Sequence, residues 1–599
     1  MRSQDPRKLV IQAIFLVLGL VYLSRLFYMQ IIDEVSTNEI RKKKIAAPRG
    51  LIYDRNGVLL VANQPVYDVW VKPSKVIDLD TFKLSKLLGL DSVDFRARWK
   101  NVSAKRKWEN KLFVSQISQQ RYTRLQEMID DFPGFTMEQG KDRVYPEHGA
   151  AHILGYISKT IPSDLQDSYY SGLDYIGRTG LEKSYEKKLR GLKGTHFFLR
   201  DVKGKNLGTW EDGLHDTLAI PGEDLTTTID IKLQKYGEAL MQNKLGSIVA
   251  LEPSTGEILA LVSSPSFDPG MMVGRVRSEN YKILEEDTLK PLYNRALMAR
   301  YPPGSTFKTI MSLIALEEGV VGEYEHVKCL KDHKIEGMVT CHDHKKNKGI
   351  REAIKYSCNT YYSVMLKRIM GQAKFGGDAS KAYDHWRNMV TSFGLNQKLN
   401  REGFGEKSGW VPKHDIYDKL YGKKHWKAPT IISLSVGQGE LLLTPLQIAN
   451  VYAVVANRGF YISPHLVKRV GSDSLIDSTF YQKHFVPISK RHFDPVLDGL
   501  EAVVEDGTAK YSSIPGVKML GKTGTAENPH GEDHSIFAAL SPRKDPKIVI
   551  CVFVENSGYG STWAAPIASL MIEKYLKGFI EKPSRKRLEK KMLEGKLLY

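Results

Sequence analysis

Cysteine is scarce in this sequence: only four occur in 599 residues, which argues against a fold held together by disulfides. No internal repeat, low-complexity segment or nucleic-acid-binding motif is found either. We therefore interpret the net charge of +19 as a solvated basic surface and expect no nucleic-acid partner. Apolar residues are not lacking, since 42% of the chain is hydrophobic, and this share excludes a disordered protein. A chain of this length is expected to form several domains.

Long apolar runs are also rare, and the one that is able to span a membrane lies near the N-terminus. It extends from Leu9 to Leu23 and can be continued to Met29. No small-x-small cleavage site follows it, so we predict an uncleaved transmembrane anchor over residues 10–29. Basic residues precede the run, which predicts a cytoplasmic tail of residues 1–9 and places the bulk of the chain outside the cytoplasm.

Two large parts are expected after the anchor. Residues 30–224 carry hairpin and turn signals such as Asn56-Gly57, and these predict a mixed, extended, β-rich domain. The turn Pro221–Asp224 marks the expected boundary to a second domain, residues 225–580. Residues 581–599 are expected to form a basic, charged tail.

The second part is expected to be an α/β (α+β) domain with an antiparallel sheet flanked by helices. Apolar runs near both of its ends indicate strands, so the two ends should meet in one sheet. The expected strands are 246–251, 257–263, 520–526, 536–540 and 548–554. The expected helices begin at Ser305 and cover 351–366, 444–456 and 566–576, whereas 374–430 is expected to be rich in loops.

A serine and a lysine three residues apart are the first sign of chemistry. Ser305 follows the turn Pro302–Gly304, and Lys308 falls on the same face of the helix that begins there. A serine hydroxyl becomes a good nucleophile when a base takes its proton, and a lysine is such a base if burial or a positive neighbour lowers its pKa. Alone, however, Ser-x-x-Lys is common by chance and usually marks a solvated helix face.

Two later motifs give this pair a catalytic meaning. Ser357-Cys358-Asn359 fits Ser-x-Asn, and Lys522-Thr523-Gly524 fits Lys-Thr-Gly. The three motifs, in this order, are those of serine β-lactamases and penicillin-binding proteins. Because each occurs in a plausible context, we interpret them as one active site.

These residue types permit acyl transfer. Ser305 would attack a carbonyl, Lys308 would accept its proton, Ser357 would relay that proton to the leaving amine, and Asn359 would hold Lys308 or a substrate amide. Backbone N–H groups of Ser305 and of the strand after Gly524 would form an oxyanion hole. A substrate carboxylate would be held by Lys522, Thr523 and Thr525, and the charge of Lys522 would lower the pKa of Lys308.

On these motifs the chain resembles the class B penicillin-binding proteins. The stretches Pro48–Gly57, Tyr175–Glu182 and Ser435–Gly439 are similar to those of penicillin-binding protein 2, the cell-elongation type. The resemblance covers nearly the whole chain and implies an inner-membrane peptidoglycan D,D-transpeptidase that maintains cell shape. A stem peptide ending in D-Ala-D-Ala would acylate Ser305 with loss of D-Ala, and an amine on a second strand would accept the acyl group. The resemblance also implies covalent inhibition by β-lactams and a membrane glycosyltransferase of the elongation machinery as partner.

Three of the four cysteines lie near the second motif. Such thiols, together with His342, Asp343 and His344, are zinc-type ligands. Some penicillin-binding proteins 2 carry a zinc near the active site, and the resemblance then implies a structural zinc, with the choice between the two histidines open. The residues predicted to bind this zinc are Cys329, Cys341, His344 and Cys358. The alternative is a Cys329–Cys341 disulfide with Cys358 as a packed thiol. No cofactor is expected to be required for catalysis.

Two other functions use the same motifs. A β-lactamase or D,D-carboxypeptidase would pass the acyl group to water, but class A β-lactamases need a positioned glutamate that we do not identify here. A small hydrolase also has no use for a long non-catalytic pedestal, the role that the resemblance gives to residues 30–224 as a penicillin-binding protein dimerisation domain. A non-catalytic β-lactam sensor would need several membrane spans and a cytoplasmic signalling module, whereas one span and a short tail are predicted here. The choice of elongation over division depends on the resemblance of the pedestal alone.

Overall fold

The chain forms two compact units. A computed structural model describes residues 6–29, 39–172, 174–201, 206–329, 339–400, 402–403, 405–472, 474–475 and 477–598. The first unit comprises Met1–Arg49 and Arg190–Gly222, and the second comprises Gly50–Leu189 and Glu223–Tyr599. Part of the expected cytoplasmic tail, residues 1–5, lies outside the described residues, as do residues 30–38 of the expected pedestal.

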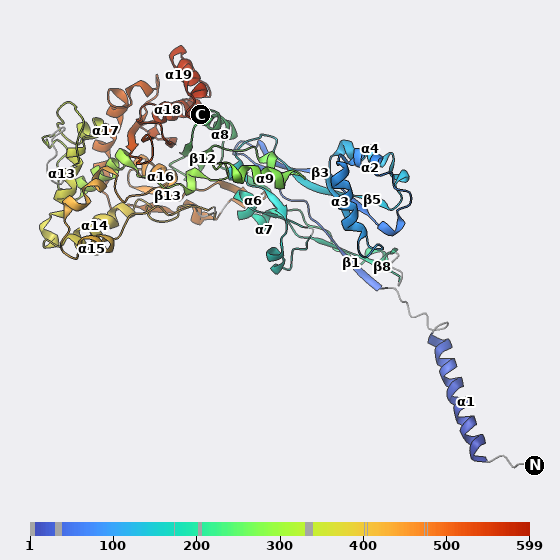
Figure 1. The fold of residues 1–599 in the computed structure, drawn as a ribbon. Helices are drawn as coiled ribbons and strands as arrows, with labels where there is room; N and C mark the ends of the chain where they lie inside the picture. The colour runs from blue at the N-terminus through green and yellow to red at the C-terminus, as the bar shows by residue number, and fades with distance from the viewer. Residues whose placement is uncertain are drawn as a thin grey trace, which may run out of the picture. The chain divides into compact units, whose positions relative to one another are not determined.

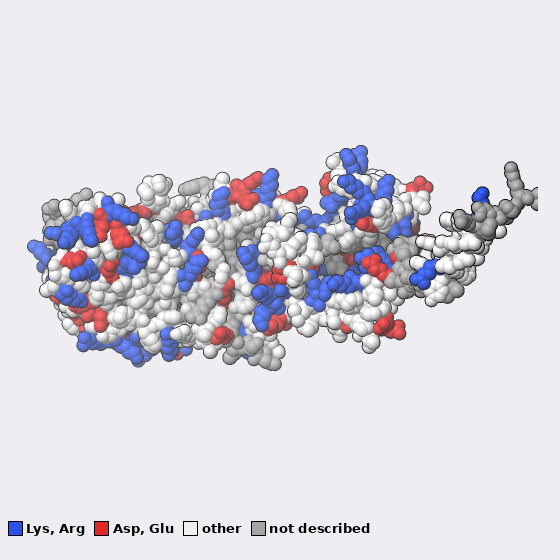
Figure 2. Space-filling view, turned by 90° about the horizontal axis from the view of Figure 1, so that it is seen from below, with Lys and Arg blue, Asp and Glu red and all other residues white. Residues whose placement is uncertain are grey.

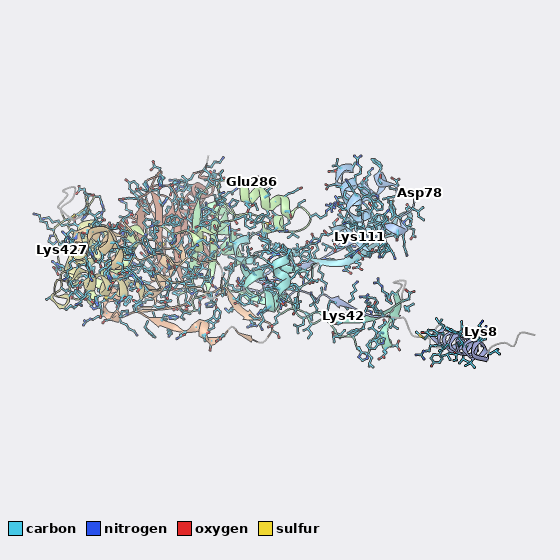
Figure 3. The ribbon with its side chains drawn as sticks, turned by 60° about the horizontal axis from the view of Figure 1, so that its bottom comes forward. Lys8, Lys42, Asp78, Lys111, Glu286 and Lys427 are labelled. Carbon is cyan, nitrogen blue, oxygen red and sulfur yellow. The ribbon has the colours of Figure 1, made fainter. Side chains whose placement is uncertain are left out.

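The first unit holds the expected anchor. Helix α1 (Pro6–Phe27) contains a window, Lys8–Phe27, that is long and apolar enough to cross a membrane (Figures 1 and 3). The basic stretch that follows is a strand, β1 (Glu39–Ile45), and it pairs with β8 (Gly194–Arg200), which in turn pairs with β9 (Asn206–Thr209). All seven residues of β1 are exposed, so this small sheet has no large core of its own.

The second unit begins with the hairpin that Asn56-Gly57 predicts. Strands β2 (Ile52–Tyr53) and β3 (Leu59–Val71) pair antiparallel, and the Asp54 carboxylate accepts the backbone N–H groups of Asn56 and Val58 at 2.7 and 2.8 Å. Strand β3 also pairs with β4 (Lys111–Ile117) and β5 (Phe135–Val144). Three helices complete a separate small core around Phe95 and Phe113: α2 (Thr81–Leu88), α3 (Ser92–Ser103) and α4 (Gln119–Gln126).

Strands from both sides of residue 224 belong to one sheet. Strand β10 (Leu225–Thr227) pairs in parallel with β2 and antiparallel with β14 (Val467–Val470), which is followed by β15 (Ser474–Leu475). Nearby, the buried Arg143 donates to Glu182 at 2.7 Å and to the Gly50 carbonyl at 2.8 Å. This network joins the segments around residues 50 and 180, both of which fall in stretches that resemble penicillin-binding protein 2.

These neighbouring segments are short. They comprise α5 (Ala151–Leu154), β6 (Ile157–Lys159), β7 (Tyr175–Gly177), α6 (Gly180–Ser184) and α7 (Glu186–Leu189). Strands β6 and β7 pair antiparallel, and α6 begins directly after the turn that follows β7.

The core of the second unit is a five-stranded antiparallel sheet, with strand order β12-β11-β19-β18-β17. The strands are β11 (Gly246–Leu251), β12 (Ile258–Ser264), β17 (Leu520–Ala526), β18 (His534–Ser541) and β19 (Ile548–Val554). The hairpin β11–β12 therefore lies beside strands from the far end of the chain, as the sequence predicts. All residues of β19 are buried, so both faces of the sheet are covered.

Helices provide this cover. Helices α8 (Ile231–Met241) and α18 (Ala564–Lys577) pack on the sheet and on each other, and α16 (Pro445–Ala456) packs on β11, β18 and β19. Helix α16 starts with the predicted Thr444-Pro445, where Thr444 and Gln447 form a capping box. Three further helices are α9 (Arg277–Glu286), α11 (Lys308–Glu317) and α17 (Phe493–Glu505).

Two expectations about helices are wrong. Residues 351–366 do not form one helix: α12 (Ile350–Lys355) and α13 (Asn359–Met370) are separated at Ser357, whose φ of 55° is left-handed. The stretch 374–430, expected to be rich in loops, contains α14 (Ala379–Thr391) and α15 (His414–Tyr421). Helix α14 buries an apolar stripe that includes Tyr383, Trp386 and Val390, a spacing hidden among polar neighbours.

The charged end of the chain packs against the domain. Residues Pro583–Glu594 form helix α19, and its Arg585 donates to Glu573 of α18 at 2.6 Å with both side chains buried. Elsewhere, basic and acidic side chains alternate over the face seen in Figure 2 and do not gather into one continuous basic patch. This distribution agrees with a solvated basic surface.

Candidate active site

Ser305 lies in a tight turn against the edge strand β17. The turn is a short 3₁₀ helix, η7 (Gly304–Phe307), that leads directly into α11. Gly304 has a φ of 53°, and a β-carbon placed on it would lie 2.7 Å from the Thr525 carbonyl oxygen, so glycine is required there. Ser305 is half-buried and lines a cleft of about 450 Å³.

Lys308 is fully buried beneath this cleft and is held by three oxygens. Its Nζ donates to the Ser357 carbonyl at 2.7 Å, to the Ser357 hydroxyl at 3.1 Å and to the Asn359 side-chain oxygen at 2.5 Å. It also lies 5.4 Å from the centre of the Tyr362 ring. Burial lowers the pKa of Lys308 to about 8, while the thiols of the nearby cysteines oppose this change.

The break between α12 and α13 gives the second motif its geometry. Because Ser357 is left-handed, it directs both its carbonyl and its hydroxyl toward Lys308. Asn359 opens α13, and its side-chain amide donates to the Thr340 carbonyl at 2.7 Å. The structure thus brings together the first two predicted motifs, since Lys308 contacts residues that lie 49 and 51 positions farther along the sequence.

The third motif lies on β17, beside the turn that carries Ser305. Thr523 and Thr525 line the cleft, and a β-carbon on Gly524 would lie 3.2 Å from the Thr306 side chain, which shows how closely the strand approaches. Lys522 is buried and donates to the Thr523 carbonyl at 3.1 Å.

The pKa values of Lys308 and Lys522 are both lowered, and the causes can be compared with the expectation that the charge of Lys522 acts on Lys308. Burial is the main cause that lowers the pKa of Lys522, and the charge of Lys308 adds to it. For Lys308, burial is what lowers the pKa, and Lys522 is not among the leading causes. Desolvation is therefore the main cause that lowers the pKa of both side chains, and the repulsion between the two ammonium groups is evident at Lys522.

Several cleft residues were not found from the sequence. The Thr508 hydroxyl lies 2.7 Å from that of Thr523, and the Gln438 amide donates to the Thr525 carbonyl at 3.1 Å. Gln438 belongs to the Ser435–Gly439 stretch that resembles penicillin-binding protein 2, so a signal for it existed. The other lining residues without a predicted role include Glu527, Asp533, Tyr559, Gly560 and Ser561, and His342, named among the zinc-type ligands in the sequence, lines the cleft as well.

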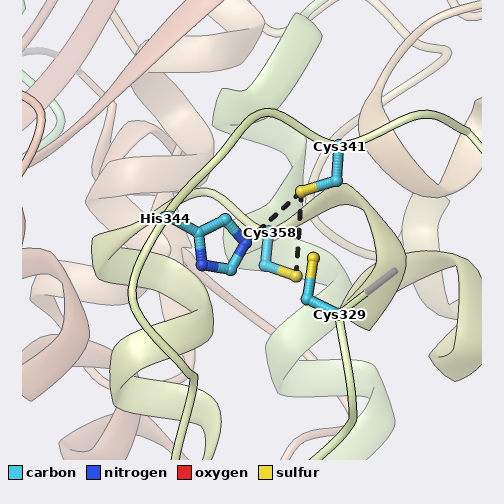
Figure 4. Close-up of side chains that lie close together, drawn as sticks. All are labelled: Cys329, Cys341, His344 and Cys358. Atoms are coloured by element: carbon cyan, nitrogen blue, oxygen red, sulfur yellow. Dashed lines mark hydrogen bonds between the residues drawn. The ribbon is translucent and has the colours of Figure 1, made fainter. Parts of the chain in front are cut away.

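The predicted metal ligands lie together directly behind the second motif. One ligand atom from each of Cys329, Cys341, His344 and Cys358 lies within 4.8 Å of all the others (Figure 4). All four cysteines of the chain are free thiols in the structure, so the alternative Cys329–Cys341 disulfide is not formed. His344 Nε2 lies 3.4 Å from the Cys341 sulfur, whereas His342 lines the catalytic cleft. Three thiols and one imidazole are a donor set that fits tetrahedral zinc.

This cluster is connected to the catalytic residues. The Asn359 backbone N–H donates to the Cys341 sulfur at 3.3 Å, and Cys358 lies between Ser357 and Asn359 in the chain. Any group that fixes the thiols therefore also fixes the oxygens that hold Lys308. The complete arrangement offers a half-buried hydroxyl, a buried amine with a lowered pKa and a strand edge in one cleft, which is what acyl transfer to a serine requires.

Two known protein families match large parts of this chain. The penicillin binding protein transpeptidase domain matches residues 246–573, more than half of the chain, and the penicillin-binding protein dimerisation domain matches residues 44–227. The chain belongs to the penicillin-binding protein transpeptidase family.

Individual proteins and solved structures of this family are similar to the chain over most of its length. The chain is 30% identical to the peptidoglycan D,D-transpeptidase MrdA of Acinetobacter baumannii, over 96% of this chain and 88% of that protein. The crystal structure of Pseudomonas aeruginosa PBP2 in complex with WCK 5153 is 27% identical, with a TM-score of 0.65 over 90% of this chain and 97% of that one. A structure of a peptidoglycan synthase complex includes a chain that is 27% identical, with a TM-score of 0.71 over 96% of this chain and 100% of that one.

Proposed function

We propose that this protein is a serine D,D-transpeptidase that cross-links peptidoglycan stem peptides during cell elongation. The observation that carries the proposal is the buried Lys308, held by Ser357 and Asn359 three residues after a cleft-lining serine. The MrdA relatives, which are named peptidoglycan D,D-transpeptidases, support the transpeptidase part of the proposal.

The first half-reaction forms an acyl-enzyme. The Ser305 oxygen attacks the carbonyl between the last two D-Ala residues of a donor stem peptide as its proton passes to the neutral amine of Lys308. The C–N bond then breaks, and the leaving D-Ala amine takes a proton that Ser357, in contact with Lys308, is placed to relay. The edge strand β17 and the turn η7 supply backbone N–H groups for the oxyanion, and Thr523 and Thr525 hold the terminal carboxylate.

The second half-reaction reverses these roles. An amine of a second stem peptide attacks the ester carbonyl, loses a proton to Lys308, and displaces the Ser305 oxygen, which recovers that proton. The new amide is the cross-link. A D,D-carboxypeptidase or β-lactamase would use water in this step, and the long first part of the chain, matched by the dimerisation domain, favours the transpeptidase.

The test is covalent labelling of the full-length protein in detergent with a fluorescent penicillin. We expect a stable labelled band for the parent and none for Ser305→Ala. Ser561→Ala removes another cleft-lining hydroxyl and should label like the parent. A band that decays within seconds would indicate a hydrolase, and labelling that survives Ser305→Ala would overturn the proposal.

We also propose that Cys329, Cys341, His344 and Cys358 hold a structural zinc. Its chemistry would be purely structural: ligation would fix Cys341 and Cys358 and, through them, Asn359 and Ser357. Metal analysis of the purified protein is expected to give one zinc per chain, and Cys341→Ser should lower both the zinc content and the thermal unfolding midpoint. Cys551→Ser, at a buried cysteine in β19, is the control for general loss of stability. Full loading of Cys341→Ser would contradict the site.

We further propose that α1 anchors the protein in the inner membrane, with its N-terminus in the cytoplasm and the catalytic cleft outside. The basic residues Arg2, Arg7 and Lys8, which precede the apolar run that starts at Leu9, support this orientation. A membrane glycosyltransferase of the elongation machinery is the proposed partner, and the peptidoglycan synthase complex of a structural relative supports it.

A further inference from the structure

The segment that leads to Ser305 is held by contacts with other parts of the chain. The Tyr301 N–H donates to the Leu443 carbonyl at 2.9 Å, and the Leu443 N–H donates back to the Tyr301 carbonyl at 2.8 Å. The Gly304 N–H donates to the Gly437 carbonyl at 2.9 Å. The backbone is therefore fixed at both ends of this segment, and Ser305 follows it directly.

The side chain of Tyr301 connects the same segment to the central sheet. Its ring stacks on Phe553 of β19, with 3.7 Å between the ring centres, and its hydroxyl donates to Glu555 Oε1 at 2.7 Å. Glu555 directly follows β19. Burial, together with the Glu555 carboxylate, raises the pKa of the Tyr301 hydroxyl well above its usual value. The hydroxyl therefore stays protonated and remains the donor of this hydrogen bond.

Glu555 is itself fixed by an ion pair. Arg295, the first residue of α10 (Arg295–Met298), donates through Nε to the same Glu555 oxygen at 3.0 Å, and the two side chains are only 8% and 19% exposed. The other guanidinium nitrogens of Arg295 donate to the Leu289 carbonyl at 2.9 Å and to the Lys290 carbonyl at 3.3 Å. The acceptor that Tyr301 meets is consequently held in one place.

This network lies outside the catalytic cleft. Tyr301 and Glu555 line a different cavity, of about 780 Å³, and neither belongs to the described residues that line the cleft with Ser305. Any effect of the two side chains on acylation must therefore pass through the turn. Such an effect is expected to be large, because a misplacement of about 1 Å between reacting groups can cost about 10²-fold in rate.

We propose that Tyr301 and Glu555 are positioning residues for acylation. The Glu555 oxygen holds the Tyr301 hydroxyl, and Tyr301 in turn holds the segment that carries Ser305. This inference depends on the proposed function, since it assumes that Ser305 is acylated. Tyr301 and Arg295 both meet the same Glu555 oxygen, so the amide oxygen of a glutamine can replace it. The negative charge of Glu555 serves the buried Arg295 instead.

The test is stopped-flow acylation of the full-length protein in detergent by a fluorescent penicillin, which separates the initial binding constant K from the acylation rate k2. Tyr301→Phe removes only the hydroxyl, so we expect k2 to fall about five- to twentyfold while K stays within about twofold. Its thermal unfolding midpoint should stay within about 2 °C of the parent.

Variants of Glu555 should separate positioning from stability. Glu555→Gln keeps the acceptor but leaves Arg295 without a counter-charge, so the unfolding midpoint should fall by about 5 °C while k2 stays within about threefold of the parent. Glu555→Ala removes the acceptor as well and should lower both quantities. A merely structural role would instead make k2 follow stability in every variant. Tyr324→Phe, at an exposed tyrosine, is the matched control and should behave like the parent.

The possible contrary results are distinct from one another. A parent-like k2 in Tyr301→Phe or in Glu555→Ala would overturn the positioning role, and so would a loss in Glu555→Gln as large as that in Glu555→Ala. A rise in K with unchanged k2 would also overturn it, because the two residues would then act on binding. Absent penicillin labelling of the parent would instead overturn the proposed function.

Discussion

At the scale of single residues, the site depends on a lysine without a carboxylate partner in the described part of the chain. Among the described residues, Lys308 contacts only neutral oxygens and the face of Tyr362, and it forms no ion pair with a carboxylate. A buried ammonium without a counter-charge is costly, so its neutral form is favoured. This is the form that accepts the Ser305 proton.

The acylation rate should therefore increase with pH. Since burial lowers the pKa of Lys308 to about 8, the second-order rate of penicillin acylation should rise as pH increases and reach half of its maximum near pH 8. Lys308→Arg keeps a positive charge that does not titrate in this range, so its rate should fall by about 10²- to 10⁴-fold and lose this pH dependence. Lys510→Arg, at a lysine that stacks on exposed Tyr511, is the control. An unchanged profile in Lys308→Arg would rule out Lys308 as the base.

The sequence predicted which residues meet here but not how they meet. Ser305 and Lys308 are close in the chain, and their relation follows from helical spacing. The contacts of Lys308 with Ser357 and Asn359 depend on a left-handed residue between two helices, and no turn signal such as glycine marks it. Thr508 carries no motif and reaches Thr523 only through the packing of α17 beside β17.

At the scale of elements, the predictions for apolar segments agree with the structure, whereas those for polar segments do not. Strands β11, β12, β18 and β19 follow from their apolar runs, and the start of α16 follows from Thr444-Pro445. By contrast, α19 is rich in charged residues and was expected as a charged tail, either mobile or helical, yet its Arg585 is buried against Glu573 and also donates to Ser569 at 2.9 Å. A buried ion pair of this kind is invisible in the periodicity because both partners are among the most polar residues.

This pair should be essential for docking α19. Arg585→Ala leaves the Glu573 carboxylate buried without its partner and should lower the free energy of unfolding by about 3–5 kcal/mol, as measured by chemical denaturation. Arg587→Ala, at an exposed position of the same helix, should change it by less than about 0.5 kcal/mol. Equal stability of the two variants would show that α19 does not depend on the buried pair.

At the scale of the whole molecule, the sequence anticipated an anchor, a β-rich first part and an α/β second part. What it did not indicate is that β10 and β14 form one sheet with β2, so that strands from both parts are hydrogen-bonded together. Such pairings join residues that are far apart in the chain, and short strands of two or three residues carry too little alternation to be recognised. The small β1-β8-β9 sheet was missed for another reason, because β1 is fully exposed and mostly charged and so lacks the apolar alternation of a half-buried strand.

The left-handed backbone at Ser357 also limits how this protein can change over generations. Threonine would keep the hydroxyl, but a β-branched residue is strained at a φ of 55°. Glycine would relieve the backbone but remove the hydroxyl that contacts Lys308. Lineages under selection by antibiotics therefore have few substitutions open at this position, and adaptive change is expected to accumulate around the rim of the cleft.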